Sequence, residues 1–242
     1  MQNRYVGDIG DFVKFAILRA LLQGGARRLG VLWWLHPDEI HNADGKHRHY
    51  LSRPSDWRHY DPALFDALRE AGKASTKHIS MLERASLLAG ACYFDELLPV
   101  GFALPDRSRA RHAWFEAARS HVQDCDLVFL DPDNGIASHR VKPTQRRAGK
   151  SVLVEELQAL RKRGRALVVY HHQSRFPGGH DAEFTALARR LEQSGLTVTG
   201  ALRASPFSPR LFLIIDGDDR IRANALRIAE AWHGKIRWLE PA

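Results

Sequence analysis

The sequence predicts an α/β fold: a mostly parallel sheet with helices on both faces, a mostly helical insertion and an antiparallel C-terminal hairpin. Short apolar segments of strand length alternate with amphipathic segments of helical length along most of the chain. Strands this apolar are typical of a parallel sheet that is covered on both faces. Near the end of the chain, two strand-like segments lie too close together in sequence to be joined by a crossover helix.

The N-terminal part contains the first predicted helix and the first predicted strand. DFVKFAILRALLQGG (11–25) has apolar residues at helical spacing and a pair of glycines that ends the pattern. LGVLWWL (29–35) is the first strand, and the polar segment 36–51 follows it. The region from about 52 to 90 has no clear strand, so we expect a mostly helical insertion there.

Further strand and helix segments alternate after this insertion. The predicted strands are ACYF (91–94), DLVFLD (126–131) and RALVVYHH (165–172), and the predicted helices cover 108–122, 150–164 and 181–195. LTVTGALRA (196–204) and RLFLIID (210–216) form the closing hairpin, because the segment SPFSP between them cannot hold a helix. We expect residues 1–242 to form a single domain.

Composition limits the class of protein. The chain of 242 residues is 44% hydrophobic and 26% charged, which is ordinary for a soluble globular protein. No apolar segment approaches the roughly 20 residues that span a membrane, and the N-terminus does not have the pattern of a secretory signal. Cys92 and Cys125 are too few for a disulfide framework, so a reducing cytoplasm is the expected location.

The charge of the chain favours an anionic partner. Its formal net charge is +8, and such an excess attracts nucleic acid, RNA or DNA, through its phosphates. The segment HRVKPTQRRAGK (139–150) concentrates basic residues, namely Arg140, Lys142, Arg146, Arg147 and Lys150. The alternative is a basic protein without a polyanionic partner. The sequence does not determine the oligomeric state.

Polar residues end the predicted strand 126–131 in the motif DPDNG (131–135). In an open α/β sheet, ligands bind beyond the carboxyl ends of the strands. Pro132 restricts the backbone and Gly135 permits a sharp turn, so we expect Asp131 and Asn134 to form a rigid polar pair facing a crevice. A turn that merely ends the strand is the alternative.

A second candidate cluster lies at the beginning of the chain. NRYVGDIGDFVKF (3–15) places Tyr5, Gly7, Asp11 and Lys14 just before and inside the first predicted helix. A loop containing glycine at a helix N-terminus can lie close to a ligand, and Lys14 would supply a cation there. Alternatively, Asp11 caps the helix and Lys14 pairs with an acid.

The two motifs together resemble those of the large-subunit ribosomal RNA adenine methyltransferases. These are Rossmann-like enzymes that use S-adenosylmethionine to methylate the exocyclic amine of one adenine. Gly7, Asp11 and Lys14 match the spacing of their N-terminal motif, and Asp131 and Pro132 match the first half of their Asp-Pro-Pro-aromatic motif. The resemblance extends loosely over the whole chain, because a closing antiparallel hairpin strand is also the arrangement of the Rossmann-like methyltransferases.

The resemblance implies a cofactor, a substrate class and a set of site residues. It implies S-adenosylmethionine as cofactor and an amine of nucleic acid as methyl acceptor. The catalytic candidates are Asp131, Asn134 and Lys14. Acids at strand ends of such enzymes bind the ribose hydroxyls or the adenine amine. Together with the N-terminal motif, this gives the candidate cofactor-binding residues Tyr5, Gly7, Asp11, Lys14, Asp38, Asp95, Glu96 and Asp131.

The sequence departs from the family at three places. Asp133 and Asn134 stand where the family has a proline and the aromatic residue that stacks on the adenine. Phe15 stands where a histidine follows the lysine. No glycine-rich loop follows the strand 29–35; the polar segment HPDEIHNADGKHRHYL (36–51) takes its place. An acid at a predicted strand end is alternatively an exposed residue of a turn.

Two other functions remain open. A metal-dependent nuclease or phosphodiesterase would hold divalent ions through Asp131, Asp133 and His171 or His172, and the histidines and acids of 36–51 are also metal ligands by type. A non-catalytic nucleotide-binding module of Rossmann-like fold is the other possibility. In every case we expect one crevice at the carboxyl ends of the strands. Its predicted lining comes from 5–14, 36–44, 93–96, 131–134 and 170–173.

Overall fold

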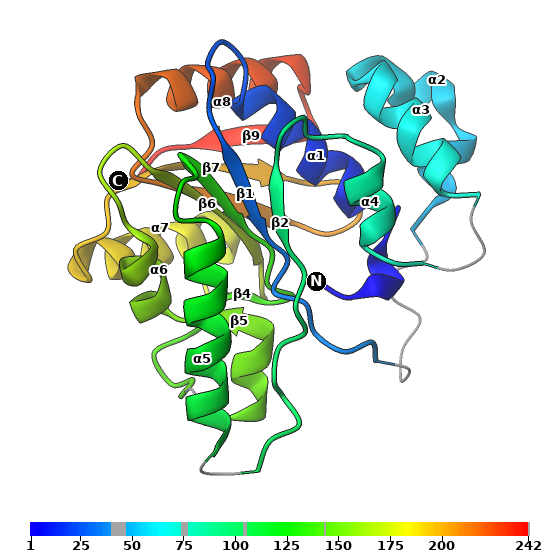
Figure 1. Cartoon of the computed structure of the whole chain (residues 1–242). Helices are drawn as coiled ribbons and strands as arrows, with labels where there is room; N and C mark the ends of the chain where they lie inside the picture. Colours follow the sequence, from blue (N-terminus) through cyan, green and yellow to red (C-terminus); the bar gives the residue numbers. More distant parts are fainter. Residues whose placement is uncertain (40–46, 74–76, 104–105, 143, 242) are drawn as a thin grey trace.

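A computed structural model of the protein describes residues 1–39, 47–73, 77–103, 106–142 and 144–241, without the side chains of Arg146 and Arg147. Its centre is a seven-stranded sheet in the order β2-β1-β3-β6-β8-β7-β9 (Figure 1). The strands are β1 (Leu29–Leu32), β2 (Cys92–Phe94), β3 (Leu127–Leu130), β6 (Ala166–His172), β7 (Val198–Ala204), β8 (Arg210–Ile215) and β9 (Ile236–Leu239).

Most strands of this sheet run in the same direction. β2, β1, β3 and β6 are parallel neighbours, while β8 is antiparallel to both β6 and β7. The predicted mostly parallel sheet with an antiparallel C-terminal hairpin is thus confirmed. β9 pairs antiparallel with β7 and was not predicted. Neither were the two short strands β4 (Gly135–Ile136) and β5 (Ser151–Val152), which pair with each other.

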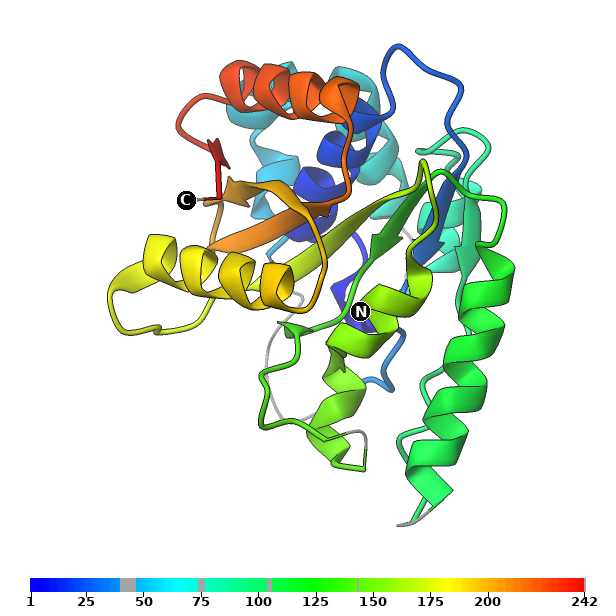
Figure 2. The ribbon, with the colours of Figure 1, turned by 90° about the vertical axis from the view of Figure 1, so that its left-hand side faces the viewer.

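Helices cover both faces of the sheet, as Figure 2 shows. The α1 face is covered by α1 (Ile9–Leu21) and α8 (Asp219–Ala231), and the α7 face by α5 (Asp106–His121), α6 (Val154–Leu160) and α7 (Gly179–Gln193). Two separate buried clusters fill the two faces. Because side chains of a strand alternate in direction, Phe129 packs on the α1 face and Leu130 on the α7 face.

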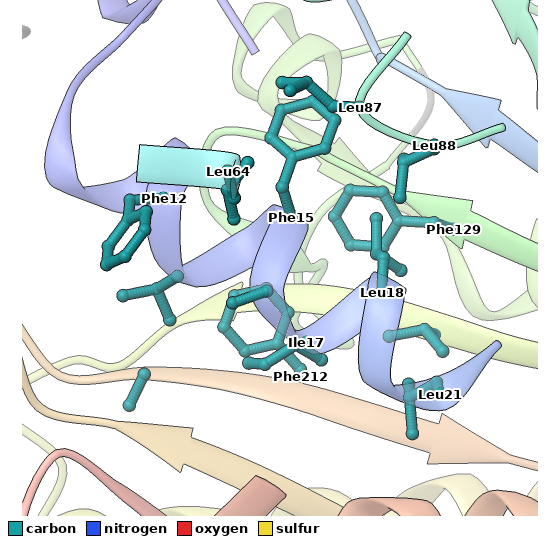
Figure 3. Packing of buried hydrophobic residues seen from close by; sticks show 14 of the residues in the cluster. Phe12, Phe15, Ile17, Leu18, Leu21, Leu64, Leu87, Leu88, Phe129 and Phe212 are labelled. Atoms are coloured by element: carbon teal, nitrogen blue, oxygen red, sulfur yellow. The ribbon is translucent and has the colours of Figure 1, made fainter. Parts of the chain in front are cut away.

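Helix α1 anchors the α1 face. Its apolar side chains, including Phe15 and Leu18, pack against Phe129 of β3 and Phe212 of β8 (Figure 3). The helix begins two residues earlier than predicted, because the carboxylate of Asp8 accepts a hydrogen bond from the backbone N–H of Asp11 and so caps it. This packing holds the first turn of α1 at the carboxyl edge of the sheet.

The insertion after β1 is helical, as predicted. It contains η2 (His49–Ser52), α2 (Pro54–Trp57), η3 (Arg58–Tyr60), α3 (Pro62–Ala71) and α4 (Ser80–Arg84), and no strand occurs among its described residues. Phe12 of α1 contacts the rings of Tyr50, Trp57 and Phe65 from this insertion. These aromatic contacts attach the insertion to the α1 face.

The predicted helix 150–164 is shorter than expected. The chain forms a 3₁₀ helix, η4 (Arg146–Lys150), and then β5 before α6 begins at Val154. The helix ends at Leu160 because Arg161 adopts an extended conformation with ψ of 138°. No helix in the described part of the chain is long and apolar enough to cross a membrane.

Candidate functional site

The order of the strands defines where a ligand is expected. β2 lies on one side of β1 and β3 lies on the other, so the direction of strand addition reverses between β1 and β3. Ligands of open α/β sheets bind beyond the carboxyl ends of the strands at such a switch point. Asp131 follows β3 directly and Trp33 follows β1 directly. The DPDNG motif therefore begins at the switch point.

A buried cluster of charges lies at this place. The Nζ of Lys14 donates a hydrogen bond to Oδ2 of Asp131 at 2.5 Å and another to Oδ1 of Asp11 at 3.0 Å. All three residues are at least 96% buried, with exposed fractions of 4%, 3% and 1% for Lys14, Asp131 and Asp11. Asp131 reaches Lys14 because strand alternation directs it, like Phe129, to the α1 face. The structure thus brings the two motifs of the sequence together.

The charges of the cluster shift the pKa values of its members. Burial alone would lower the pKa of Lys14, but the carboxylates of Asp131 and Asp11 outweigh it and raise this pKa. Burial raises the pKa of Asp131 and of Asp11, and the Lys14 ammonium opposes both shifts. Lys14 therefore stays protonated. Protonating one of the two carboxyl groups requires less free energy than protonating a carboxyl group at the surface.

One oxygen of Asp131 is not used by this cluster. Oδ2 accepts from Lys14, whereas Oδ1 accepts no hydrogen bond from any residue that the structure describes. The fully buried polar atoms that lack a hydrogen-bond partner do not include this Oδ1 atom. The carboxylate is thus held in one orientation by Lys14 and retains an acceptor for a ligand that approaches the switch point.

The first two residues of the chain fill the space beside Asp131. The ammonium of Met1 donates to the carbonyl oxygens of Asp131 at 2.7 Å and Trp34 at 3.3 Å, and lies 2.7 Å from Oδ1 of Asp133. The Gln2 amide donates to Oδ2 of Asp133 at 2.5 Å. Met1 and Gln2 are only 3% and 0% exposed. A ligand between β1 and β3 therefore requires these two residues to move.

Asp133 differs from Asp131 in its environment. Burial would raise the pKa of Asp133, but the Met1 ammonium and the Gln2 amide outweigh burial and lower it. Oδ2 thus accepts a hydrogen bond from Gln2, and Oδ1 forms an ion pair with the Met1 ammonium. The sequence contains no local signal for this contact, because Gln2 and Asp133 are 131 residues apart in the chain.

The loop after β1 has a strained backbone. Trp34 has a φ of 49°, a left-handed conformation that costs a residue with a side chain about 1–2 kcal/mol. Its carbonyl oxygen accepts from the Met1 ammonium. A tryptophan side chain thus occurs at a backbone conformation that glycine adopts readily.

The second half of the DPDNG motif turns to the α7 face. The backbone N–H of Asn134 donates to Lys150, and its side chain is exposed, so Asn134 does not pair with Asp131. Gly135 has a φ of 92°, and a Cβ there would lie 2.4 Å from Nδ1 of His171. The expected rigid pair of Asp131 and Asn134 is therefore divided between the two faces. Gly135 is needed for the turn and for close contact with β6.

His171 belongs to a separate polar group on the α7 face. Nδ1 of His171 accepts from the backbone N–H of Ile136, so its ring proton lies on Nε2, 3.8 Å from Glu183. Glu183 also accepts from the N–H and the hydroxyl of Ser174. Burial raises the pKa of Glu183, but His171 and Ser174 outweigh it and lower this pKa to about 2.

The registers place these groups at one edge of the sheet. Leu130 of β3 is level with Val169 of β6, so Asp131 and His171 follow at the same, carboxyl end of parallel strands. They point to opposite faces, because Asp131 alternates with Leu130 and His171 is two residues from Val169, which packs on the α7 face.

The remaining predicted cofactor residues lie around this edge without joining the Lys14 cluster. Gly7 is the exception, since its N–H donates to Oδ2 of Asp11 at 2.8 Å. The hydroxyl of Tyr5 accepts from Arg4, and the exposed Asp38 accepts from the N–H of the same residue. Asp95 and Glu96 follow β2 and are exposed. Within the described residues, no hydrogen bond joins these four to Lys14 or Asp131.

The metal alternative has little support in the described part of the chain. No group of three or more His, Cys, Asp or Glu side chains there could hold a metal ion. Asp131 and Asp133 instead pair with the cations of Lys14 and Met1. His41, Asn42 and Asp44 of the polar segment after β1 lie outside the described residues.

The fold and the site define a Rossmann-like α/β protein with a buried carboxylate–lysine cluster at its switch point. Comparison of the chain with protein-family models, with curated proteins and with solved structures finds no match in any of the three. The function must therefore be inferred from the site itself.

Proposed function

We propose that this protein is an S-adenosylmethionine-dependent methyltransferase that acts on an amine of nucleic acid, RNA or DNA. The observation that carries the proposal is the pair Lys14–Asp131 at the switch point, with Oδ1 of Asp131 unused. The two residues belong to sequence motifs that resemble those of one methyltransferase family, and they are 117 residues apart in the chain. Their contact supports a shared role in one site.

Asp131 has the chemistry to receive an amine. A carboxylate oxygen accepts a hydrogen bond from an exocyclic N–H, which orients the nitrogen lone pair toward a methyl donor. Lys14 holds Asp131 in place and keeps a positive charge beside it. S-adenosylmethionine would supply the electrophilic methyl group.

The donor set suits this cofactor by type, but the space is filled in this structure. Asp131 offers one unused carboxylate oxygen beside the cation of Lys14 to a molecule that carries an ammonium, hydroxyls and a carboxylate, whereas both oxygens of Asp11 already accept hydrogen bonds from Lys14 and Gly7. Met1 and Gln2 occupy the place beside them. The proposal therefore includes displacement of these two residues when the cofactor binds. It also includes a cytoplasmic location, since Cys92 and Cys125 are free thiols in the structure.

The filled crevice favours a second candidate, a Rossmann-like module that binds a nucleotide without catalysis. In that case Met1 and Gln2 are a permanent part of the fold, and the Lys14 cluster only stabilises it. The two candidates differ in whether S-adenosylmethionine binds.

Calorimetric titration with S-adenosylmethionine separates these candidates. We expect binding by the wild type and tighter binding by Gln2→Ala, because the lost amide contact with Asp133 makes residues 1–2 easier to displace. Asp131→Asn should retain most of the affinity and lower methyl transfer to bulk RNA or DNA by roughly 100-fold or more. Asp66→Asn, which changes an exposed carboxylate of the insertion, is the control.

The outcomes are distinct for each candidate. A wild type and a Gln2→Ala variant that both fail to bind S-adenosylmethionine would refute the methyltransferase and leave the non-catalytic module. Tight binding of Mg²⁺ or Mn²⁺ that Asp131→Asn abolishes would instead support a metal-dependent nuclease.

A further inference from the structure

A cavity opens on the α7 face, beside the second half of the DPDNG motif. Its volume is about 600 Å³, which lies within the range of small-molecule sites. Its lining includes Asn134, Ile136, His171, Phe176, Glu183 and Arg190. These residues come from the loop and strand after Asp131, from the end of β6 and from one side of α7. None of them belongs to the Lys14 cluster.

Arg190 gives the cavity an unused cation. Its Nε and Nη2 atoms are buried and have no hydrogen-bond partner among the described residues. Burial lowers the pKa of Arg190, and only the charge of Glu155 opposes this. Arg190 is partly buried, and leaving two buried guanidinium nitrogens without acceptors is costly, so the side chain favours an anion that brings oxygen atoms to them.

The other charges of the cavity do not satisfy Arg190. Glu183 is the one acid among the described lining residues. Its carboxylate is already engaged by the N–H and hydroxyl of Ser174, and His171 lies 3.8 Å away. Arg190 therefore gives its part of the cavity wall a positive charge. The negative charge of Glu183, in the same wall, is already engaged by Ser174 and faces His171.

The remaining lining suits a flat aromatic group. Phe176 is 37% exposed although it is a large apolar residue, and it shares the cavity with Ile136 and Leu187. The exposed amide of Asn134 supplies both a donor and an acceptor at the side nearest Asp131. An aromatic ring, apolar walls, one amide and one guanidinium are the groups that a base and its phosphate require.

We propose that this cavity binds one nucleotide unit, with its base against Phe176 and its phosphate at Arg190. The role of this nucleotide rests on the proposed function, in which Asp131 receives the methyl acceptor. Because Asp131 points to the opposite face of the sheet, the nucleotide in the cavity is a neighbour of the acceptor in the same strand. The cavity then holds the strand while the acceptor reaches the switch point.

Binding of adenosine 5′-monophosphate by calorimetry tests the proposal without any cofactor. Arg190→Gln should weaken this binding about 10- to 100-fold, the scale of a charge-assisted hydrogen bond. Phe176→Ala should weaken it about 5- to 100-fold through lost stacking. Arg189→Gln changes an exposed neighbour on the same helix and should leave the affinity within about twofold. Thermal unfolding checks that each variant is folded.

Two simpler ligands test the two halves of the site. The affinity for adenosine should be the same in the wild type and in Arg190→Gln, because adenosine has no phosphate. The affinity for inorganic phosphate should be the same in the wild type and in Phe176→Ala, because phosphate has no base. A short single-stranded oligonucleotide should compete with the mononucleotide if the site serves a strand; failure to compete would limit the site to free nucleotides and contradict the role given to it here.

Other results would overturn the inference. Equal affinities of the wild type and Arg190→Gln would show that the guanidinium does not hold the phosphate. Inorganic phosphate that binds as tightly as the nucleotide would remove the base from the site. Nucleotide binding with these dependences, in a protein that does not bind S-adenosylmethionine, would support the cavity and refute the methyltransferase.

Discussion

Lys14 and Asp131 form a buried hydrogen-bonded ion pair of 2.5 Å between the first helix and the end of the third strand of the chain. Asp11 completes the cluster at 3.0 Å from the same ammonium. A buried ion pair is not by itself strong evidence for stability, because both charges lose their hydration. Removing one partner is different, since it leaves the other charge buried and uncompensated.

Lys14→Met should therefore lower the free energy of unfolding by about 3–5 kcal/mol. Urea denaturation measures this change. Lys73→Met removes an exposed pair with Glu70 and should cost at most about 0.5 kcal/mol. A double-mutant cycle with Asp131→Asn should give a coupling well above that of the exposed pair. A Lys14→Met variant as stable as the wild type would mean that the cluster is not buried as described.

Gly135→Ala should be destabilising for two reasons. The φ of 92° is unfavourable for alanine, and the new Cβ would lie 2.5 Å from Cα of His171, a backbone atom that cannot turn away. Strain and overpacking together give about 2–5 kcal/mol. Gly164→Ala is the matched control, because Gly164 also has a positive φ, of 80°, but nothing within 4 Å of its Cβ position. Its cost should be only about 1–2 kcal/mol, and equal costs in the two variants would refute the close contact with His171.

Glu183 should make stability depend on pH in the acidic range. Its pKa falls from the usual 4.5 to about 2 in the folded protein. A carboxyl group with a lowered folded-state pKa stabilises the fold above its unfolded-state pKa, and this contribution is lost as the pH falls through the folded-state value. Stability should thus decrease between about pH 4.5 and pH 2.

Glu183→Gln removes this titration. Thermal unfolding of the wild type and the variant between pH 2 and pH 6 should show curves that converge at the acidic end. Curves that stay parallel over this range would show that the carboxylate is not stabilised by Ser174 and His171. Glu192→Gln, on the exposed side of the same helix, should behave like the wild type.

The basic segment 139–150 should contribute to nucleic-acid binding. Lys150 pairs with Glu39 at 2.5 Å, so Lys142, which is exposed, is a better choice than Lys150 for substitution together with Arg146 and Arg147. The triple alanine variant should bind single-stranded RNA or DNA more weakly. Its salt dependence should also be smaller, by about 0.7 in the log–log slope for each lost phosphate contact.

Electrophoretic titration at several salt concentrations measures both effects. A variant of Arg58, Arg69 and Lys73, three exposed cations of the insertion, controls for the change in net charge. Equal losses in the two variants would assign binding to the overall charge of +8 rather than to the segment 139–150.

Much of the fold follows from local patterns. The apolar segments became β1, β2, β3, β6, β7 and β8, and the closing hairpin is antiparallel because SPFSP is too short for a crossover. The sequence does not indicate β4, β5 and β9, because β4 and β5 contain only two residues each and β9 interrupts its apolar residues with Arg237. The helix 150–164 was predicted too long because its pattern does not show the extended residue at Arg161.

The sequence by itself determined that Asp131 and Lys14 are unusual, because each stands in a motif whose residue types and spacing can be read locally. Only the tertiary structure decided that they meet across 117 residues, and that Asn134 turns away from them to a cavity on the other face. It also decided that Met1 and Gln2 are buried against Asp131 and Asp133, and that Arg190 and Phe176 line the cavity. The physical reason is that periodicity fixes which face of a strand or helix is buried, whereas the partners of a buried polar group are set by how the elements cross in space.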